Sequence, residues 1–258
     1  MTDINNARDA RIKLATVNRA LAPIGYEPFA GPDLTTLPNV TEPTPDEIHA
    51  AITSSKGAPE KSAAVQALAA RAWLSSTGAA KSLEWGAEVA AWETCKAALP
   101  AISDEIRERY ADAAERLREA ATGPFTGTAD LNSLDLHTLP TPLAKQAGAV
   151  IEDYRQAVAL HGAWRSIWAA LHEGAPTHWT EMAHPTNDEY RAARDATPQL
   201  WPTPDPWSVA RLGWTGALPE SLRAAGQRRA DYQTTAIRAE QKQAQEARRR
   251  ALAGGSFL

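Results

Sequence analysis

SDEIRERYADAAERLREAA, residues 103–121, carries the clearest structural pattern in the chain. Apolar side chains return every three or four residues, which places them on one face of an α-helix. Charge pairs four residues apart, Glu105 with Arg109 and Asp112 with Arg116, lie on the opposite face. A Gly-Pro pair directly after the segment ends the helix. The segment therefore predicts an amphipathic helix, whose apolar stripe consists of Ile102, Ile106, Tyr110, Ala113, Leu117 and Ala121.

Helical spacing of apolar residues continues on both sides of this segment. Two flanking segments open with a Thr-x-x-Glu capping box, at residues 44–47 and 186–189, which signals a helix start. We interpret Gly78 and Pro100 as helix breaks, so that three consecutive helices form an antiparallel hairpin or bundle. The helices predicted in this way span residues 5–22, 45–53, 59–76, 79–99, 103–121, 141–172, 187–197 and 219–253.

The pattern as a whole predicts an all-α protein, an irregular helical bundle with a Pro/Trp-rich irregular segment and a long C-terminal helix. Residues 1–30 form the N-terminal helix and the start of a Pro-rich linker, and residues 44–197 form the helical body. The Pro/Trp-rich segment spans residues 198–218, and a basic C-terminal helical arm spans residues 219–258. The polar stretch 125–140 supports no definite structure.

Composition limits the class of protein. A chain of 258 residues can build one large core or two ordinary ones. Its net charge of −4 argues against a protein that covers nucleic acid with its whole surface. The single Cys95 cannot form an internal disulfide, which favours a reducing compartment. Neither a signal peptide nor an apolar run of about 20 residues is recognisable, so we expect no membrane contact and a cytoplasmic location, or a virion if the chain is phage-encoded.

The histidines are the first candidates for a metal site. His172, His178 and His184 lie close together in the sequence, with Glu181 between the last two, but they do not form the His-Glu-x-x-His helix of metalloproteases. Ordinary hydrogen bonds explain these histidines without a metal. Residues 57–62 offer a glycine, a lysine and a serine before a helix, but a glutamate stands where a phosphate loop needs glycine. We expect no catalytic residue, no metal and no cofactor.

The Pro/Trp-rich segment favours extended, polyproline-like geometry and leaves two interpretations open. In the first, Trp201, Trp207 and Trp214 fold back and pack on the helical body, while the prolines lower the entropy cost of ordering the segment. In the second, the segment is exposed, and Trp201 and Trp207 dock another subunit.

The C-terminal arm is the strongest functional signal. Eight basic residues stand against four acidic ones between residues 219 and 253, and large apolar residues are almost absent after Ile237. A helix that is polar on all sides either projects into solvent or is stabilised by a partner, so a solvated tail and a partner-binding arm both fit. The candidate partner-binding residues of the arm are Arg228, Arg229, Arg238, Lys242, Arg248, Arg249 and Arg250.

Three functional hypotheses follow. The leading one is a non-enzymatic structural or assembly protein that binds another protein or a second copy of itself. The alanine- and arginine-rich composition of the chain is typical of a GC-rich genome and fits an actinobacterial phage or mobile element. The alternative is a nucleic-acid-binding regulator that places the arginines of the arm on phosphates. The third is a metal-dependent enzyme that uses the region of His178 and His184.

Overall fold

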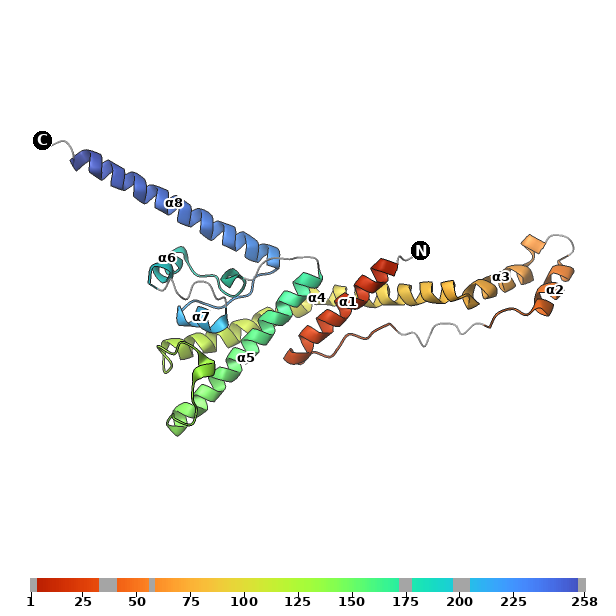
Figure 1. Cartoon of the computed structure of the whole chain (residues 1–258), viewed down its shortest axis with the longest axis horizontal. Coiled ribbons are helices and arrows are strands. Elements are labelled where there is room, and N and C mark those ends of the chain that lie inside the picture. The colour runs from red at the N-terminus through yellow and green to blue at the C-terminus, as the bar shows by residue number, and fades with distance from the viewer. Residues whose placement is uncertain (1–3, 33–40, 56–58, 172–177, 197–204, 255–258) are drawn as a thin grey trace. The chain divides into compact units, whose positions relative to one another are not determined.

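The computed structural model confirms the all-α fold class (Figure 1). It describes residues 4–32, 41–55, 59–171, 178–196 and 205–254. These ranges contain no β-strand beyond one isolated bridge, and none of their helices has the length and apolar character to cross a membrane. The α-helices are α1 (Ile4–Leu21), α2 (Pro45–Ser54), α3 (Ala63–Ser75), α4 (Thr77–Thr122), α5 (Thr141–Ala170), α6 (Asn187–Ala196), α7 (Pro206–Arg211) and α8 (Leu222–Gly254). Short 3-10 helices are η1 (Ala22–Ile24), η2 (Pro59–Lys61), η3 (Leu131–Ser133) and η4 (Trp179–Glu181).

The chain forms two compact units. The first comprises Met1–Arg19 and Glu27–Ala98, and the second comprises Ala20–Tyr26 and Leu99–Leu258. The division therefore passes through α4, which contributes its first part to one unit and its second part to the other. The four segments predicted from the sequence were defined by proline content and charge. Their limits do not coincide with the limits of these units.

In the first unit, α1 lies against the first part of α4. The Lys13 ammonium is 5.8 Å from the centre of the Trp92 ring. The Asn18 side chain donates to the carbonyl of Phe29 (3.0 Å) and accepts from its N–H (2.9 Å), which ties the segment after the helix back onto α1. The buried stripe of α1 in this unit consists of Ala7, Ala10, Leu14 and Val17, at the spacing expected of an amphipathic helix.

The helix break predicted at Pro100 is wrong. The structure has one helix, α4, with Pro100 inside it, so no hairpin forms between residues 79–99 and 103–121. An internal proline removes one backbone hydrogen bond and costs about 3 kcal/mol. Burial of one helix face continues through the proline and offsets that cost. The buried residues of this face are Trp92, Cys95, Leu99, Ser103, Ile106 and Tyr110.

In the second unit, α5 packs along the second part of α4. The Nε of Arg116 donates to the Asp153 carboxylate at 2.8 Å, which joins the two helices on their solvent side. The stripe predicted for residues 103–121 is buried, apart from the partly exposed Ile102. The fully buried side chains include Tyr110 and Leu117 from α4, and Leu160, Trp164 and Ile167 from α5.

The extended geometry predicted for residues 198–218 is wrong at Pro206–Arg211, which form the helix α7. The Asp205 carboxylate accepts from the backbone N–H groups of Trp207 (3.0 Å) and Ser208 (3.2 Å) and so caps α7. Pro206 occupies the first turn, where a helix tolerates proline because that N–H has no partner within the helix. High proline content is therefore compatible with this helix start.

Gly216 lets the chain pass directly over α4 after α7. A Cβ at this position would lie 2.2 Å from the Cβ of Ala114, which no side chain could occupy without a shift of the backbone. Trp214 and Leu218 on either side are both buried. The segment between α7 and α8 is thus anchored in the core of the second unit.

Both predicted capping boxes are confirmed. At α2 the Thr44 hydroxyl and the Glu47 carboxylate each accept from the other residue's backbone N–H. At α6 the Thr186 hydroxyl accepts from the N–H of Glu189 (3.3 Å), and the Glu189 carboxylate accepts from the N–H of Thr186 (2.7 Å). The long C-terminal helix is present as α8, and its first part packs against η4.

Candidate functional site

Glu181, on η4, is a buried carboxylate with only 1% of its surface exposed. It accepts hydrogen bonds from the Nη1 of Arg165 (2.6 and 2.8 Å) and lies 3.0 Å from the Nε2 of His161, both on α5. Burial alone would raise the pKa of Glu181, but the hydrogen bonds and charges of His161 and Arg165 outweigh it and lower the pKa. This ion pair holds η4 on α5, so the carboxylate already has partners within the chain.

His178 and His184, considered above as metal ligands, have other surroundings. The Nδ1 of His178 is 3.1 Å from the hydroxyl oxygen of Thr180. No group of three or more His, Cys, Asp or Glu side chains that could hold a metal ion occurs in the part of the chain that the structure describes. His172 lies outside that part.

Each of these two histidines has an arginine near it. Loss of solvation lowers the pKa of His178, and repulsion from Arg229 lowers it further. The pKa of His184 is lowered by loss of solvation and then by repulsion from Arg228. Glu181 opposes this effect at His178, so His184 is the ring beside which an added anion would be more favourable than an added cation.

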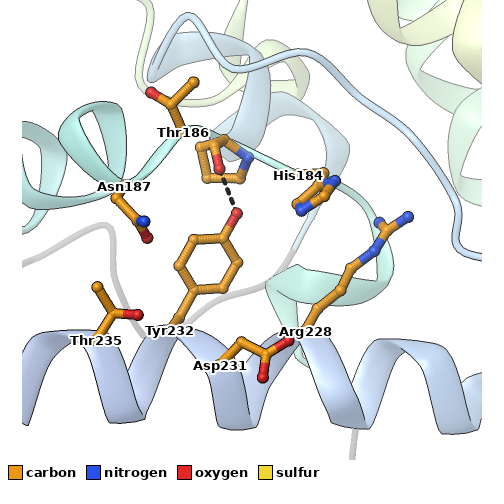
Figure 2. Close-up of a pocket in the computed structure, with 8 residues that line it drawn as sticks. His184, Thr186, Asn187, Arg228, Asp231, Tyr232 and Thr235 are labelled. Carbon is orange, nitrogen blue, oxygen red and sulfur yellow. Dashed lines mark hydrogen bonds between the residues drawn. The ribbon is translucent and has the colours of Figure 1, made fainter.

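A cavity of about 470 Å³ lies between residues 184–187 and one face of α8 (Figure 2). The Tyr232 hydroxyl donates to the carbonyl of Pro185, and the rings of Tyr190 and Tyr232 stack with their centres 5.0 Å apart. These contacts fasten the segment before α6 to α8 and so form the two walls. We call this cavity the α6–α8 pocket, and it is lined by His184, Pro185, Thr186, Asn187, Arg228, Asp231, Tyr232 and Thr235.

Arg228 brings a half-buried guanidinium to one end of the pocket, beside His184 (Figure 2). Its Nη1 donates to the carbonyl of Ala217 at 3.3 Å, and no carboxylate of the described residues forms an ion pair with it. Loss of solvation lowers its pKa, and repulsion from Arg107 adds to this against the opposing field of Glu220. Most of the five N–H donors of Arg228 are therefore unused by the chain.

The other end of the pocket is polar and has unused hydrogen-bonding capacity. Neither the Asn187 amide nor the Thr235 hydroxyl bonds to another residue in the described ranges, although both line the pocket. The Asp231 carboxylate accepts from the amide of Gln227 at 2.9 Å and keeps further acceptor positions. Asp231 lies beside Arg228 on α8 (Figure 2), so the pocket offers a cation and a carboxylate at one end and neutral polar groups at the other.

The predicted partner-binding residues of the arm fall into two sets. Arg228 and Arg229 lie on the packed first part of α8, and neither is fully exposed. Arg238 and Lys242 are exposed, as are the other described side chains of α8 beyond Thr235. Residues 248–250 belong to α8, but their side chains lie outside the description. Among the candidate residues whose side chains are described, Arg238 and Lys242 are the ones exposed to a partner.

Trp207 does not form the docking surface considered above. It is 3% exposed, and its indole N–H donates to the carbonyl of Thr128 at 3.1 Å. Trp214 is buried as well, so the packing interpretation describes both residues. The cause is α7, which turns the Trp207 ring toward the core of its unit. Trp201 lies outside the described residues.

An apolar surface that the sequence interpretation missed lies on α2 and α3. Ten of the 13 residues of α3 are apolar, yet none is buried. Ile48 and Ile52 on α2 are 42% and 49% exposed, and Trp73 on α3 is 58% exposed. A groove of about 160 Å³ runs between the helices. We call its lining the α2–α3 apolar face: Ile48, Ala51, Ile52, Val65, Leu68, Ala69 and Ala72.

An ion pair beside this face joins the two helices. The Nη1 of Arg71 donates to Glu47 at 3.0 Å, and its Nε donates to the carbonyl of Thr41 at 3.0 Å. The hydrogen bond from Arg71, followed by that from the Thr44 backbone, lowers the pKa of Glu47 to about 2. Because Glu47 and Arg71 neutralise each other, neither places an unpaired charge beside the α2–α3 apolar face.

The sequence did contain a signal for this face. Apolar residues surround nearly the whole of α3 instead of forming one stripe, and a helix of that kind is normally buried.

Compared with known proteins, the chain matches no family model, no curated protein and no solved structure. Its function must therefore be inferred from the chemistry of the α2–α3 apolar face and the α6–α8 pocket.

Proposed function

We propose that the protein is a non-enzymatic assembly protein, and that a second copy of this chain covers its α2–α3 apolar face. The observation that carries the proposal is α3, a helix of 13 residues of which none is buried although most are apolar. Contiguous apolar surface in water is unfavourable, and where it persists on a folded protein it marks an interaction site. An actinobacterial phage or mobile element remains the setting that the composition favours.

Charge favours a second copy as the occupant. No charged residue lines the groove, and the pair of Glu47 and Arg71 beside it is internally neutralised. Two identical uncharged faces can meet about a twofold axis without repulsion between like charges. Two α2–α3 hairpins placed in this way form a four-helix arrangement, in which each α3 gains the cover that it lacks within one chain.

The test is the mass of the full chain in solution, measured by light scattering from about 1 to 100 µM, where a typical weak dimer would assemble. We expect a dimer or larger oligomer, and we expect Ile52→Glu to shift the mass to that of a monomer. Ile12→Glu on α1 is the matched control, because Ile12 is similarly exposed at 53% but lies outside the face.

Two results would contradict the proposal. A wild-type chain that stays monomeric at the highest concentration has no second copy on this face, and a partner of another kind would then be required. An equal loss of mass in Ile52→Glu and Ile12→Glu would show that any added charge disrupts assembly, irrespective of the face.

The nucleic-acid alternative rests on Arg238 and Lys242, the two described basic residues exposed on the outer part of α8. Phosphate contacts of this kind give an affinity that falls steeply with salt. Replacing both residues by glutamate should then abolish binding to duplex DNA in a low-salt gel-shift assay, whereas Gln241→Glu between them should weaken it less. Absence of wild-type binding at low salt would remove this alternative.

A further inference from the structure

We propose that the α6–α8 pocket binds a small hydroxylated organic anion, whose carboxylate or phosphate group pairs with Arg228. This inference is independent of the assembly function, because the pocket lies in the second unit and the α2–α3 apolar face lies in the first.

The first argument is the state of Arg228. Its guanidinium is half-buried and faces the pocket, and a backbone carbonyl is its hydrogen-bond acceptor in the described chain. A desolvated cation without an anionic partner is unfavourable, so an anion bound there would recover the lost solvation. The planar fork of arginine N–H groups matches the oxygens of a carboxylate or a phosphate.

The second argument is the position of His184 beside Arg228. The His184 ring lies beside the guanidinium in Figure 2 and lines the same end of the pocket. It makes no hydrogen bond to the described residues, so a ring N–H can be donated to a bound anion. The two side chains come from opposite walls of the pocket, which are fixed by the contact of Tyr232 with Pro185.

The third argument is the remaining space. The cavity of about 470 Å³ is much larger than one anionic group, and lies within the range of small-molecule sites. At the far end, Asn187 and Thr235 offer donors and acceptors for hydroxyl groups. Asp231 lies beside Arg228 and disfavours any further negative charge, so the site suits a ligand with one anionic group and hydroxyls on the rest of its skeleton.

The test uses calorimetric titration of the full chain with glycerate and with glycerol 3-phosphate. These probes carry a carboxylate and a phosphate on similar hydroxylated skeletons, so their relative affinities identify the preferred anionic group. Glycerol is the uncharged control. We expect saturable binding of at least one anion with a dissociation constant of roughly 0.1 to 1 mM, and no binding of glycerol.

Arg228→Gln should weaken that binding at least about tenfold, as expected when a charge-assisted hydrogen bond is removed. The matched control is Arg238→Gln, an exposed arginine on the same helix outside the pocket, which should leave the affinity unchanged. Absence of binding by both anions at about 10 mM, which corresponds to a binding free energy too weak for a built site, would overturn the proposal. An unchanged affinity in Arg228→Gln would do so as well.

A second variant tests the site even if Arg228→Gln does not fold. Asp231 is exposed, and Asp231→Asn keeps an acceptor for hydroxyl groups while removing the negative charge from the pocket. We expect the affinity for glycerol 3-phosphate to rise about threefold, because the repulsion between like charges is lost. An affinity that stays the same or falls would place the anion away from Asp231 and its neighbour Arg228, and would contradict the proposed orientation.

Discussion

The α2–α3 hairpin and the region where η4 meets α5 and α8 have opposite relations to water. In the hairpin, apolar side chains such as Ile52 and Trp73 are about half exposed. In the η4 region even a carboxylate, Glu181, is buried and paired with Arg165. The hairpin exposes apolar side chains, which a folded chain normally buries. The η4 region buries a carboxylate, which a folded chain normally exposes.

This difference shows which region is fully packed and paired within a single chain. The η4 region satisfies its buried charge internally, so substitutions there should act on stability. The hairpin buries almost nothing of α3, so substitutions there should act on association and leave the stability of the single chain nearly unchanged. Each region thus predicts a different response to the same kind of substitution.

The largest expected effect comes from comparing two tryptophans. Trp164→Ala should lower the free energy of unfolding by about 3 to 5 kcal/mol, because Trp164 is fully buried and its removal leaves a cavity. Trp73→Ala should change it by less than about 0.5 kcal/mol at a concentration where the chain is monomeric. Urea denaturation followed by circular dichroism measures both.

Trp164→Phe refines this comparison. The Trp164 indole N–H has no hydrogen-bond partner in the described structure, so phenylalanine removes a buried unpaired donor while it keeps most of the apolar volume. We expect a loss well below that of Trp164→Ala. Equal losses in Trp73→Ala and Trp164→Ala would break the distinction between the two regions.

The next effect concerns the buried charge. Glu181→Gln should destabilise the chain by about 3 kcal/mol, because it leaves Arg165 without its carboxylate partner in a partly buried site. Glu152→Gln on α5 is the matched control, since the ion pair of Glu152 with Arg155 is exposed and exposed pairs contribute about 0 to 1 kcal/mol. Chemical denaturation of both variants gives the two values, and similar losses would show that η4 is not held by Glu181.

The sequence predicts those parts of the fold that short-range interactions determine. The two capping boxes and the apolar stripe of residues 103–121 depend on residues three or four positions apart, so each can be recognised in the chain. Pro100 could not be placed in this way. Whether a proline ends a helix depends on the burial gained beyond it, and burial is a property of the tertiary structure.

The candidate sites show the same limit. The α6–α8 pocket exists because Tyr232 bonds to Pro185, a contact between residues 47 positions apart that no local pattern encodes. Arg228 was recognised as a candidate, but as part of an exposed arm rather than of a pocket wall. Trp207 was considered as a docking residue because its proline-rich surroundings hid the start of α7. The α2–α3 apolar face was encoded in the composition of α3 and was overlooked.

A smaller effect in the η4 region is the dependence of stability on pH. The pKa values of His178 and His184 are lowered in the folded chain, so below their ordinary pKa of 6.5 the unfolded chain binds more protons. Stability from these groups is complete above that pH and is lost on acidification. The lowered pKa of Glu181 extends the loss below its ordinary value of 4.5.

Thermal unfolding between pH 7.5 and 4 measures this dependence. We expect the melting temperature to fall as the pH falls, in a first step from the histidines and a second from carboxylates with a lowered pKa, among them Glu181 and Glu47. Replacing His178 and His184 by glutamine should flatten the first step, and Glu181→Gln should flatten the second. A melting temperature that rises on acidification would contradict the assigned directions.

The smallest expected effect is that of truncating α8. The last buried side chain described in this helix is Tyr232, and beyond Thr235 its described side chains are exposed. Ending the chain after Arg238 should therefore change the free energy of unfolding by no more than about 0.5 kcal/mol.

Thermal unfolding of the intact and truncated chains at low and high salt also tests whether the outer part of α8 is held against the rest of the protein by charge. If the basic residues strapped α8 across an acidic surface, truncation would lower the melting temperature, and salt would reduce the difference by screening. A projecting helix predicts the same transition in both chains at both salt concentrations.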